Sequence, residues 1–229
     1  MKNRQIIIKA LGGGCPVFIN QVHGKKLLVL KKNKKDIKKC KQGISDSFDS
    51  SAISSSPAFS DHPCVDSVGS LLPCADGMVT DIPGLLLFIQ VADCQSVMLY
   101  DPAKKAVANI HSGWKGSIKN IIGAGIDTMK QEFGSDPCDI LAGIGPSLGP
   151  CCSEFVNYKS EIPEEFLIYK RGKNHFDFWQ MSIDQLTGKG LKPENIELSR
   201  ICTKCFHDSF FSYRYAKITG RFAAVIGLL

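Results

Sequence analysis

Three residues that could bind a transition metal lie at the ends of apolar segments. His23 closes the segment NQVHG, Cys94 lies in VADCQS, and His111 heads HSGWKG. Two imidazoles and one thiolate suit zinc, and three protein ligands leave a fourth coordination position open for water or substrate. Taken singly, each has a structural alternative, since buried cysteines are usually core residues and lone histidines are usually structural. Together they favour a catalytic metal centre over a structural one.

The same residues allow two other kinds of chemistry. Copper could bind the set of one cysteine and two histidines, but an oxidase that reduces oxygen would need further histidine-rich copper sites, and the chain has five histidines in all. Without a metal, Cys94 could act as a nucleophile with His111 as its base. That reading requires a lowered thiol pKa and contact between the two side chains.

The elements that must position these residues alternate along the chain. Apolar runs predict two strands within 15–32 and strands at 85–92, 96–100, 106–110, 139–144, 196–200 and 222–229. A helix is predicted to open at 117–122, after His111, and further helices at 121–133 and around 181–190. The segment 75–84 is expected to be a turn. Interleaved strands and helices indicate an α/β or α+β fold with mixed sheets.

Composition sets limits on function and location. The 229 residues suffice for one domain, interrupted by a Lys/Ser-rich insertion at about 31–70. Much of the net charge of +6 lies in the run KKNKKDIKKCK, so we expect a solvated loop and no nucleic-acid partner. The longest apolar run is too short to span a membrane, and no signal peptide is visible. We therefore expect a cytoplasmic monomer or weak homo-oligomer whose ten cysteines stay reduced.

Several sequence motifs resemble those of one protein family. The segments NQVHG, ADGMVTD, ADCQSVMLYDP, HSGWKG, GPSLGPCC, FFSYR and TGRFAAVIGL are similar, in this order, to motifs of the YfiH family of laccase-domain or polyphenol oxidase-like proteins. The resemblance implies a four-layer α/β/β/α fold and zinc held by His23, Cys94 and His111. It also implies a purine nucleoside phosphorylase acting on adenosine, inosine, guanosine and methylthioadenosine, with adenosine deaminase activity. An older label for the family is copper oxidase.

The resemblance also directs attention to charged residues that could bind phosphate. Lys115 stands where the family usually has an arginine, and Arg214 and Arg221 keep positive charge in the last motifs. A lysine lacks the guanidinium fork, so it fixes phosphate geometry less well. Asp93 could orient His23 or His111 through a ring N–H, or could cap a turn. The chain begins near the family's Asn-Arg motif, which keeps an inactive, truncated relative as an alternative.

Two cysteine pairs remain outside this site. Cys202 and Cys205 form a C-x-x-C motif, CTKC, with the spacing of a zinc knuckle or a redox site, but a single such motif is weak evidence for a structural zinc. The vicinal pair Cys151 and Cys152 matches a family motif. We expect this pair to pack near the site.

Overall fold

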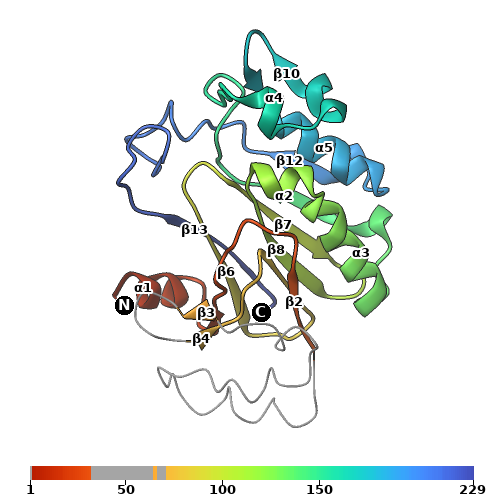
Figure 1. Cartoon of the computed structure of the whole chain (residues 1–229). Coiled ribbons are helices and arrows are strands. Elements are labelled where there is room, and N and C mark those ends of the chain that lie inside the picture. Colours follow the sequence, from red (N-terminus) through yellow and green to blue (C-terminus); the bar gives the residue numbers. More distant parts are fainter. Residues whose placement is uncertain (1, 32–63, 66–70) are drawn as a thin grey trace.

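Two facing sheets form the centre of the structure, a computed structural model that describes residues 2–31, 64–65 and 71–229 (Figure 1). The larger sheet has the strand order β12-β9-β7-β8-β5-β2, and the smaller has the order β1-β6-β13. The strands of the larger sheet are β2 (Leu27–Leu30), β5 (Gly77–Thr80), β7 (Gln95–Asp101), β8 (Ala106–Ser112), β9 (Leu141–Ile144) and β12 (Ile196–Leu198). Those of the smaller are β1 (Cys15–Val17), β6 (Leu85–Val91) and β13 (Phe222–Gly227).

Helices and short hairpins complete the described residues. The α-helices are α1 (Lys2–Ala10), α2 (Trp114–Ile118), α3 (Ile121–Phe133), α4 (Tyr158–Glu161) and α5 (Phe178–Gly188). The 3-10 helices are η3 (Pro137–Asp139), η4 (Glu164–Tyr169) and η5 (Pro193–Asn195). The two-stranded sheets pair β10 (Lys170–Arg171) with β11 (His175–Phe176) and β3 (Cys64–Val65) with β4 (Leu71–Leu72).

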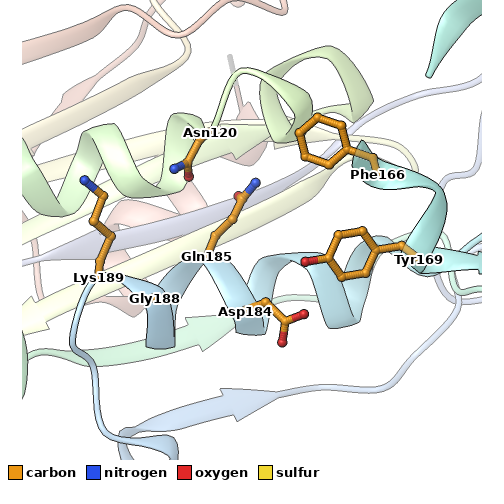
Figure 2. Close-up of a pocket in the computed structure, with 7 residues that line it drawn as sticks. All are labelled: Asn120, Phe166, Tyr169, Asp184, Gln185, Gly188 and Lys189. Carbon is orange, nitrogen blue, oxygen red and sulfur yellow. The ribbon is translucent and has the colours of Figure 1, made fainter. Parts of the chain in front are cut away.

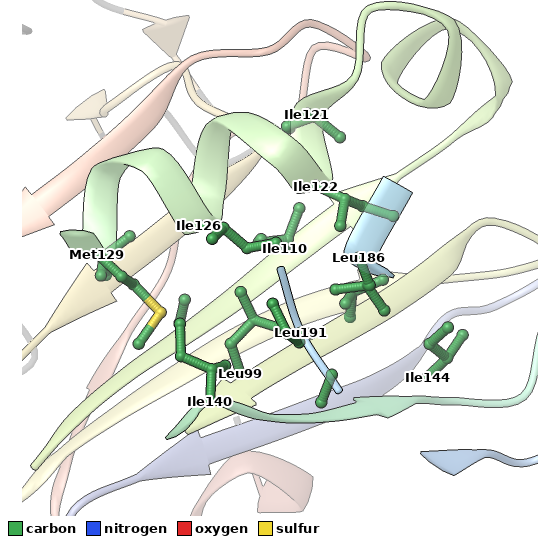
Figure 3. Close-up of a cluster of buried hydrophobic side chains, with 14 of the residues drawn as sticks. Leu99, Ile110, Ile121, Ile122, Ile126, Met129, Ile140, Ile144, Leu186 and Leu191 are labelled. Carbon is green, nitrogen blue, oxygen red and sulfur yellow. The ribbon is translucent and has the colours of Figure 1, made fainter. Parts of the chain in front are cut away.

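Helices α3 and α5 cover one face of the larger sheet. Helix α3 begins after Asn120, whose side chain accepts a hydrogen bond from the N–H of Gly123, and ends at Gly134 in the left-handed conformation. Its apolar residues recur at helical spacing and share one core with residues of β5, β7, β8 and β9. Figure 3 shows this core, with side chains of α3 directed toward Leu99 and Ile110 of the sheet.

A second core fills the space between the two sheets. Alternate residues of β6, Leu87 and Ile89 among them, face the larger sheet, while Leu86 and Phe88 pack beneath Ile8 of α1. The layers are therefore helices, larger sheet, smaller sheet and α1. This confirms the predicted α/β class with mixed sheets and the four-layer arrangement.

The predicted strands and helices from residue 85 onward are all present, with ends shifted by a few residues. The turn predicted at 75–84 is wrong in part, because it contains β5, a short buried strand between Gly and Pro signals that suggested a turn. Helix α1 was not predicted. Most of the predicted insertion at 31–70 lies outside the described residues.

The composition led us to expect neither a membrane span nor a disulfide. No helix in residues 2–31, 64–65 and 71–229 is long and apolar enough to cross a membrane. The expectation of reduced cysteines fails at Cys74, which is disulfide-bonded.

Candidate metal centre

His111 lies on the inner face of β8, near the end of the strand. Ala106, Ala108 and Ile110 belong to the core beneath the helices. Because side chains alternate along a strand, His111 shares the opposite face, toward the smaller sheet, with Val107 and Asn109. Only 2% of His111 is exposed. The strand therefore holds a buried imidazole between the two sheets.

Asp76 is the residue that fixes this imidazole, and sequence reasoning missed it. It directly precedes β5, which pairs antiparallel with β8, so the two residues meet: the backbone N–H of His111 donates to the Asp76 carbonyl. The His111 Nδ1–H donates to Oδ1 of Asp76 at 2.9 Å. Since Nδ1 is the donor, Nε2 is the ring nitrogen that can bind a metal once its proton has been displaced.

The Asp76 carboxylate also holds the second histidine through its backbone. It accepts hydrogen bonds from the backbone N–H groups of His23, at 2.8 Å, and Gly24, at 2.6 Å. His23 has a φ of 57°, a left-handed conformation that these bonds stabilise. Burial raises the pKa of Asp76, but its hydrogen bonds to His111, Gly24 and His23 outweigh burial and hold the pKa below the ordinary value.

Cys94 lies where the chain passes from β6 in the smaller sheet to β7 in the larger one. Its Sγ is 3.9 Å from Nε2 of His23. Burial raises the pKa of Cys94, but His111 and His23 outweigh burial and bring the pKa to about 7. In turn, burial lowers the pKa of His111, whereas Asp76 and Cys94 raise it to about 9. Near neutral pH, in the metal-free chain, the imidazolium of His111 therefore lies beside the thiolate form of Cys94.

The three predicted ligands come together in the structure. The ligand atoms of His23, Cys94 and His111 all lie within 4.8 Å of one another. Gly113 leaves room for them, because a Cβ there would lie 2.9 Å from Cδ2 of His23 and 3.2 Å from Sγ of Cys94. Two nitrogen donors and one sulfur donor fit zinc, or copper, and leave a fourth coordination position to another ligand.

The three predicted cationic residues have other partners. The Lys115 ammonium lies over the Trp114 ring, 5.4 Å from its centroid. Arg214 donates from its guanidinium to the carbonyl of Glu154 at 2.6 Å, and Arg221 donates to the carbonyls of Thr219 and Gly220. Within the part of the chain that the structure describes, no hydrogen bond or ion pair joins these three cations to the metal-ligand cluster.

Asp93 does not orient either imidazole in the structure. Its carboxylate accepts a hydrogen bond from the Thr203 hydroxyl at 2.7 Å and another from the backbone N–H of Arg214 at 2.6 Å. With a φ of 83°, Asp93 turns the chain sharply before Cys94. The carboxylate beside His111 is Asp76, and Asp93 instead ties the β6–β7 turn to the C-terminal segment.

A pocket of about 300 Å³ lies elsewhere, between α5 and η4 (Figure 2). Its lining residues are Asn120, Phe166, Tyr169, Asp184, Gln185, Gly188 and Lys189. None of them belongs to the His23, Cys94 and His111 cluster. The cluster is the stronger candidate site, because it gathers groups that can bind a metal and because the pKa values of Cys94 and His111 are shifted.

Comparisons with known proteins find relatives that carry the names of two activities on nucleosides. The chain is 35% identical over 148 residues to a purine nucleoside phosphorylase of Bacteroides thetaiotaomicron, and the match covers 61% of this chain and 55% of that protein. It is 29% identical over 162 residues to adenosine deaminase RL5 of an unknown prokaryotic organism, a match that covers 66% of this chain and 60% of that protein. The chain thus spans little more than half the length of these relatives.

Solved structures and a family model extend the likeness to the whole chain. The crystal structure of the hypothetical protein YfiH of Bacillus licheniformis matches with a TM-score of 0.77 and 26% identity, over 100% of this chain and 80% of that one. The family model described as multi-copper polyphenol oxidoreductase laccase matches residues 1–229. The chain therefore belongs to this laccase-like family, the YfiH family that its motifs resemble.

Proposed function

We propose that the chain is a zinc-dependent purine nucleoside phosphorylase with adenosine deaminase side activity. The observation that carries the proposal is the cluster of His23, Cys94 and His111, with Asp76 holding the His111 tautomer, in a chain whose relatives carry the names of both activities. The substrates are purine nucleosides, namely adenosine, inosine, guanosine and methylthioadenosine, together with phosphate.

The metal ligands and Asp76 would have different roles in phosphorolysis. In phosphorolysis a phosphate oxygen attacks the anomeric carbon, the N-glycosidic bond breaks, and the purine leaves with the bonding electrons and takes up a proton. A zinc ion held by the three ligands would supply Lewis-acid polarisation of phosphate or water. Asp76 accepts from Nδ1 of His111 and so directs Nε2 toward the metal, which would displace the Nε2 proton on binding, and the lowered pKa of Cys94 favours the thiolate that a metal requires.

Anion binding is assigned to Lys115, Arg214 and Arg221. Lys115 follows Gly113 by two residues, so it lies on the same turn of chain that borders the cluster. Arg214 is tied by its backbone to Asp93, the neighbour of Cys94. A cation near the ligands would stabilise negative charge on phosphate in the transition state. Asp93 is assigned a positioning role through this bond.

The proposal predicts that turnover depends on the metal at this cluster. The protein is stripped with a chelator, its metal content is measured, and it is reloaded with zinc or with copper. Inosine and phosphate are then supplied, and hypoxanthine and ribose 1-phosphate are quantified. Zinc should restore product formation, and a Cys138→Ala control, at an exposed free cysteine, should behave as wild type.

The same samples separate the alternatives. A cysteine hydrolase, with Cys94 as nucleophile and His111 as base, is supported by the pKa of the thiol, which His111 and His23 lower. Such an enzyme would keep its activity after the metal is removed. A copper polyphenol oxidase, suggested by the family description, would consume oxygen with a phenol only after copper loading. An inactive relative would bind zinc and turn over no nucleoside.

A further inference from the structure

Four free cysteines gather at a second place in the fold. Cys151 and Cys152 follow β9, and Cys202 and Cys205 follow β12. Because β9 and β12 are parallel neighbours, the segments after their carboxyl ends leave the sheet side by side. An isolated parallel bridge between Ser147 and Cys202 continues this pairing beyond the strands. The topology thus brings together two pairs that are separate in the sequence.

The sulfur atoms have the spacing of ligands around one metal ion. All four Sγ atoms lie within 4.8 Å of one another. Sγ of Cys205 is 3.7 Å from that of Cys151 and 3.6 Å from that of Cys152. Four sulfurs at the zinc–sulfur distance of about 2.3 Å, at the corners of a tetrahedron, are about 3.8 Å apart. A disulfide would need about 2.05 Å.

Backbone hydrogen bonds hold both cysteine segments in this arrangement. The N–H of Cys152 donates to the carbonyl of Gly149, and the N–H of Phe206 donates to that of Cys202. A Cβ on Gly149 would lie 3.1 Å from Cβ of Cys202 and 2.9 Å from the Trp179 ring, so the glycine permits the close approach. The ligand positions are therefore fixed by the loops themselves.

We propose that Cys151, Cys152, Cys202 and Cys205 form a structural site for a single zinc ion. Four thiolates complete the tetrahedron and leave no open position, which is the mark of a structural rather than a catalytic zinc. The close grouping of all four sulfurs favours one metal ion over a two-iron cluster, in which the cysteines bind different irons. The site is separate from His23, Cys94 and His111, and it does not depend on the proposed function.

This second site would position groups beside the first. Thr203, between the two cysteines of CTKC, donates its hydroxyl to Asp93, the neighbour of Cys94. Arg214, further along the same segment, donates its backbone N–H to the other carboxylate oxygen of Asp93. Zinc bound by the four cysteines would anchor this segment to the loop after β9. The anchor would hold Thr203 and Arg214 against Asp93.

Metal stoichiometry tests the proposal in the full chain. Purified protein expressed with zinc should contain about two zinc ions per chain by elemental analysis. Cys205→Ser and Cys94→Ala should each halve this content, and the double variant should hold almost none. Cys138→Ser, a control at an exposed free cysteine outside both clusters, should keep both ions.

A spectroscopic measurement keeps the test decisive if Cys205→Ser fails to fold. The Cys94→Ala chain, which retains the four-cysteine cluster, is loaded with cobalt(II) as the probe. Strong thiolate-to-cobalt charge-transfer bands with the visible bands of tetrahedral coordination are expected. No such bands, a wild-type content of one zinc that Cys94→Ala removes, or a disulfide among the four cysteines in mass spectra would each overturn the proposal.

Discussion

Asp76 joins the two histidines of the candidate centre into one unit. One carboxylate oxygen accepts from the ring of His111 and from the backbone of His23, and the other accepts from Gly24. The Asp76 side chain is fully buried, and its bond to the ring of His111 forms away from water. A substitution of Asp76 should therefore change the affinity for the metal, although Asp76 is not itself a proposed ligand.

We expect Asp76→Asn to weaken zinc binding about 10- to 100-fold, the usual effect of losing a carboxylate behind a metal-binding histidine. An amide can keep one acceptor, but its NH₂ group would face a backbone N–H that needs an acceptor. Competition with a zinc-binding dye measures the affinity. Asp127→Asn, at an exposed carboxylate paired with Lys189, should bind zinc as wild type does. Equal affinity in both variants would contradict the role given to Asp76.

Gly113→Ala should impair the metal site by crowding it. The backbone of Gly113, with φ −77° and ψ 168°, suits alanine, so only the contacts of the new methyl group matter. That methyl would press on His23 and Cys94 and push their ligand atoms apart. We expect weaker zinc binding in the same dye assay with little change in the thermal midpoint. Gly188→Ala, where an added Cβ meets nothing within 4 Å, is the matched control.

The lowered pKa of Cys94 predicts how its thiol reacts in metal-stripped protein. The pKa falls from an ordinary 9.0 to about 7, so the thiolate persists at lower pH in the folded chain. The rate of Cys94 alkylation by iodoacetamide, followed by mass spectrometry of its peptide, should rise with a midpoint near pH 7. His23→Ala and denatured chain should both move the midpoint up toward 9.0. A folded-state midpoint already at 9.0 would refute the proposed contact.

The candidate ligands were predicted from their types and positions together with the resemblance of the motifs to a family, but the partners of these residues were not predicted. His23, Cys94 and His111 each follow or end an apolar run, a position typical of functional side chains. Asp76 is brought to His111 by the antiparallel register of β5 and β8, which no local pattern encodes. Asp93 seemed suited because it precedes Cys94. Its left-handed backbone sends the carboxylate to Thr203 and Arg214 instead.

At the scale of elements, strand β8 of the larger sheet contacts the helical layer with one face and the smaller sheet with the other. One face packs beneath α3, and the other carries Val107, Asn109 and His111 toward the smaller sheet. The side chain of Asn109 is fully buried and donates to the carbonyls of Leu87 in β6 and Ala224 in β13. These bonds fasten the two sheets together close to the metal centre.

Asn109→Ala should therefore destabilise the protein by about 1 to 3 kcal/mol, the cost of leaving buried polar groups without their partner. Urea unfolding followed by circular dichroism measures the free energy of unfolding. Asn195→Ala removes an exposed bond to the Cys138 carbonyl and should stay within about 0.5 kcal/mol of wild type. If the two variants lose equal stability, Asn109 does not fasten the sheets.

Elements with a strong periodic pattern were predictable, and short ones were not. The apolar runs of β6 and β13 and the helical spacing of α3 identify them without any tertiary context. The four residues of β5 lie between Asp76 and a Pro-Gly turn, so local signals favour a turn. Its strand character comes from pairing on both sides, with β8 and β2.

At the scale of the whole molecule, the candidate centre depends on the meeting of the two sheets. His111 comes from the larger sheet, Cys94 from the passage between the sheets, and His23 from the segment that joins β1 to β2. The four-layer arrangement was predictable only through the resemblance of the motifs to a family. Composition and periodicity alone indicate no more than mixed α and β structure.

The most direct test of the central claim is product analysis with the zinc-loaded protein. Inosine is supplied with and without phosphate, beside Cys94→Ala and the Cys138→Ala control. We predict hypoxanthine and ribose 1-phosphate only when phosphate is present, and loss of both products in Cys94→Ala. Zinc-loaded wild type that forms no ribose 1-phosphate, or a Cys94→Ala chain that forms it as fast as wild type, would contradict the account.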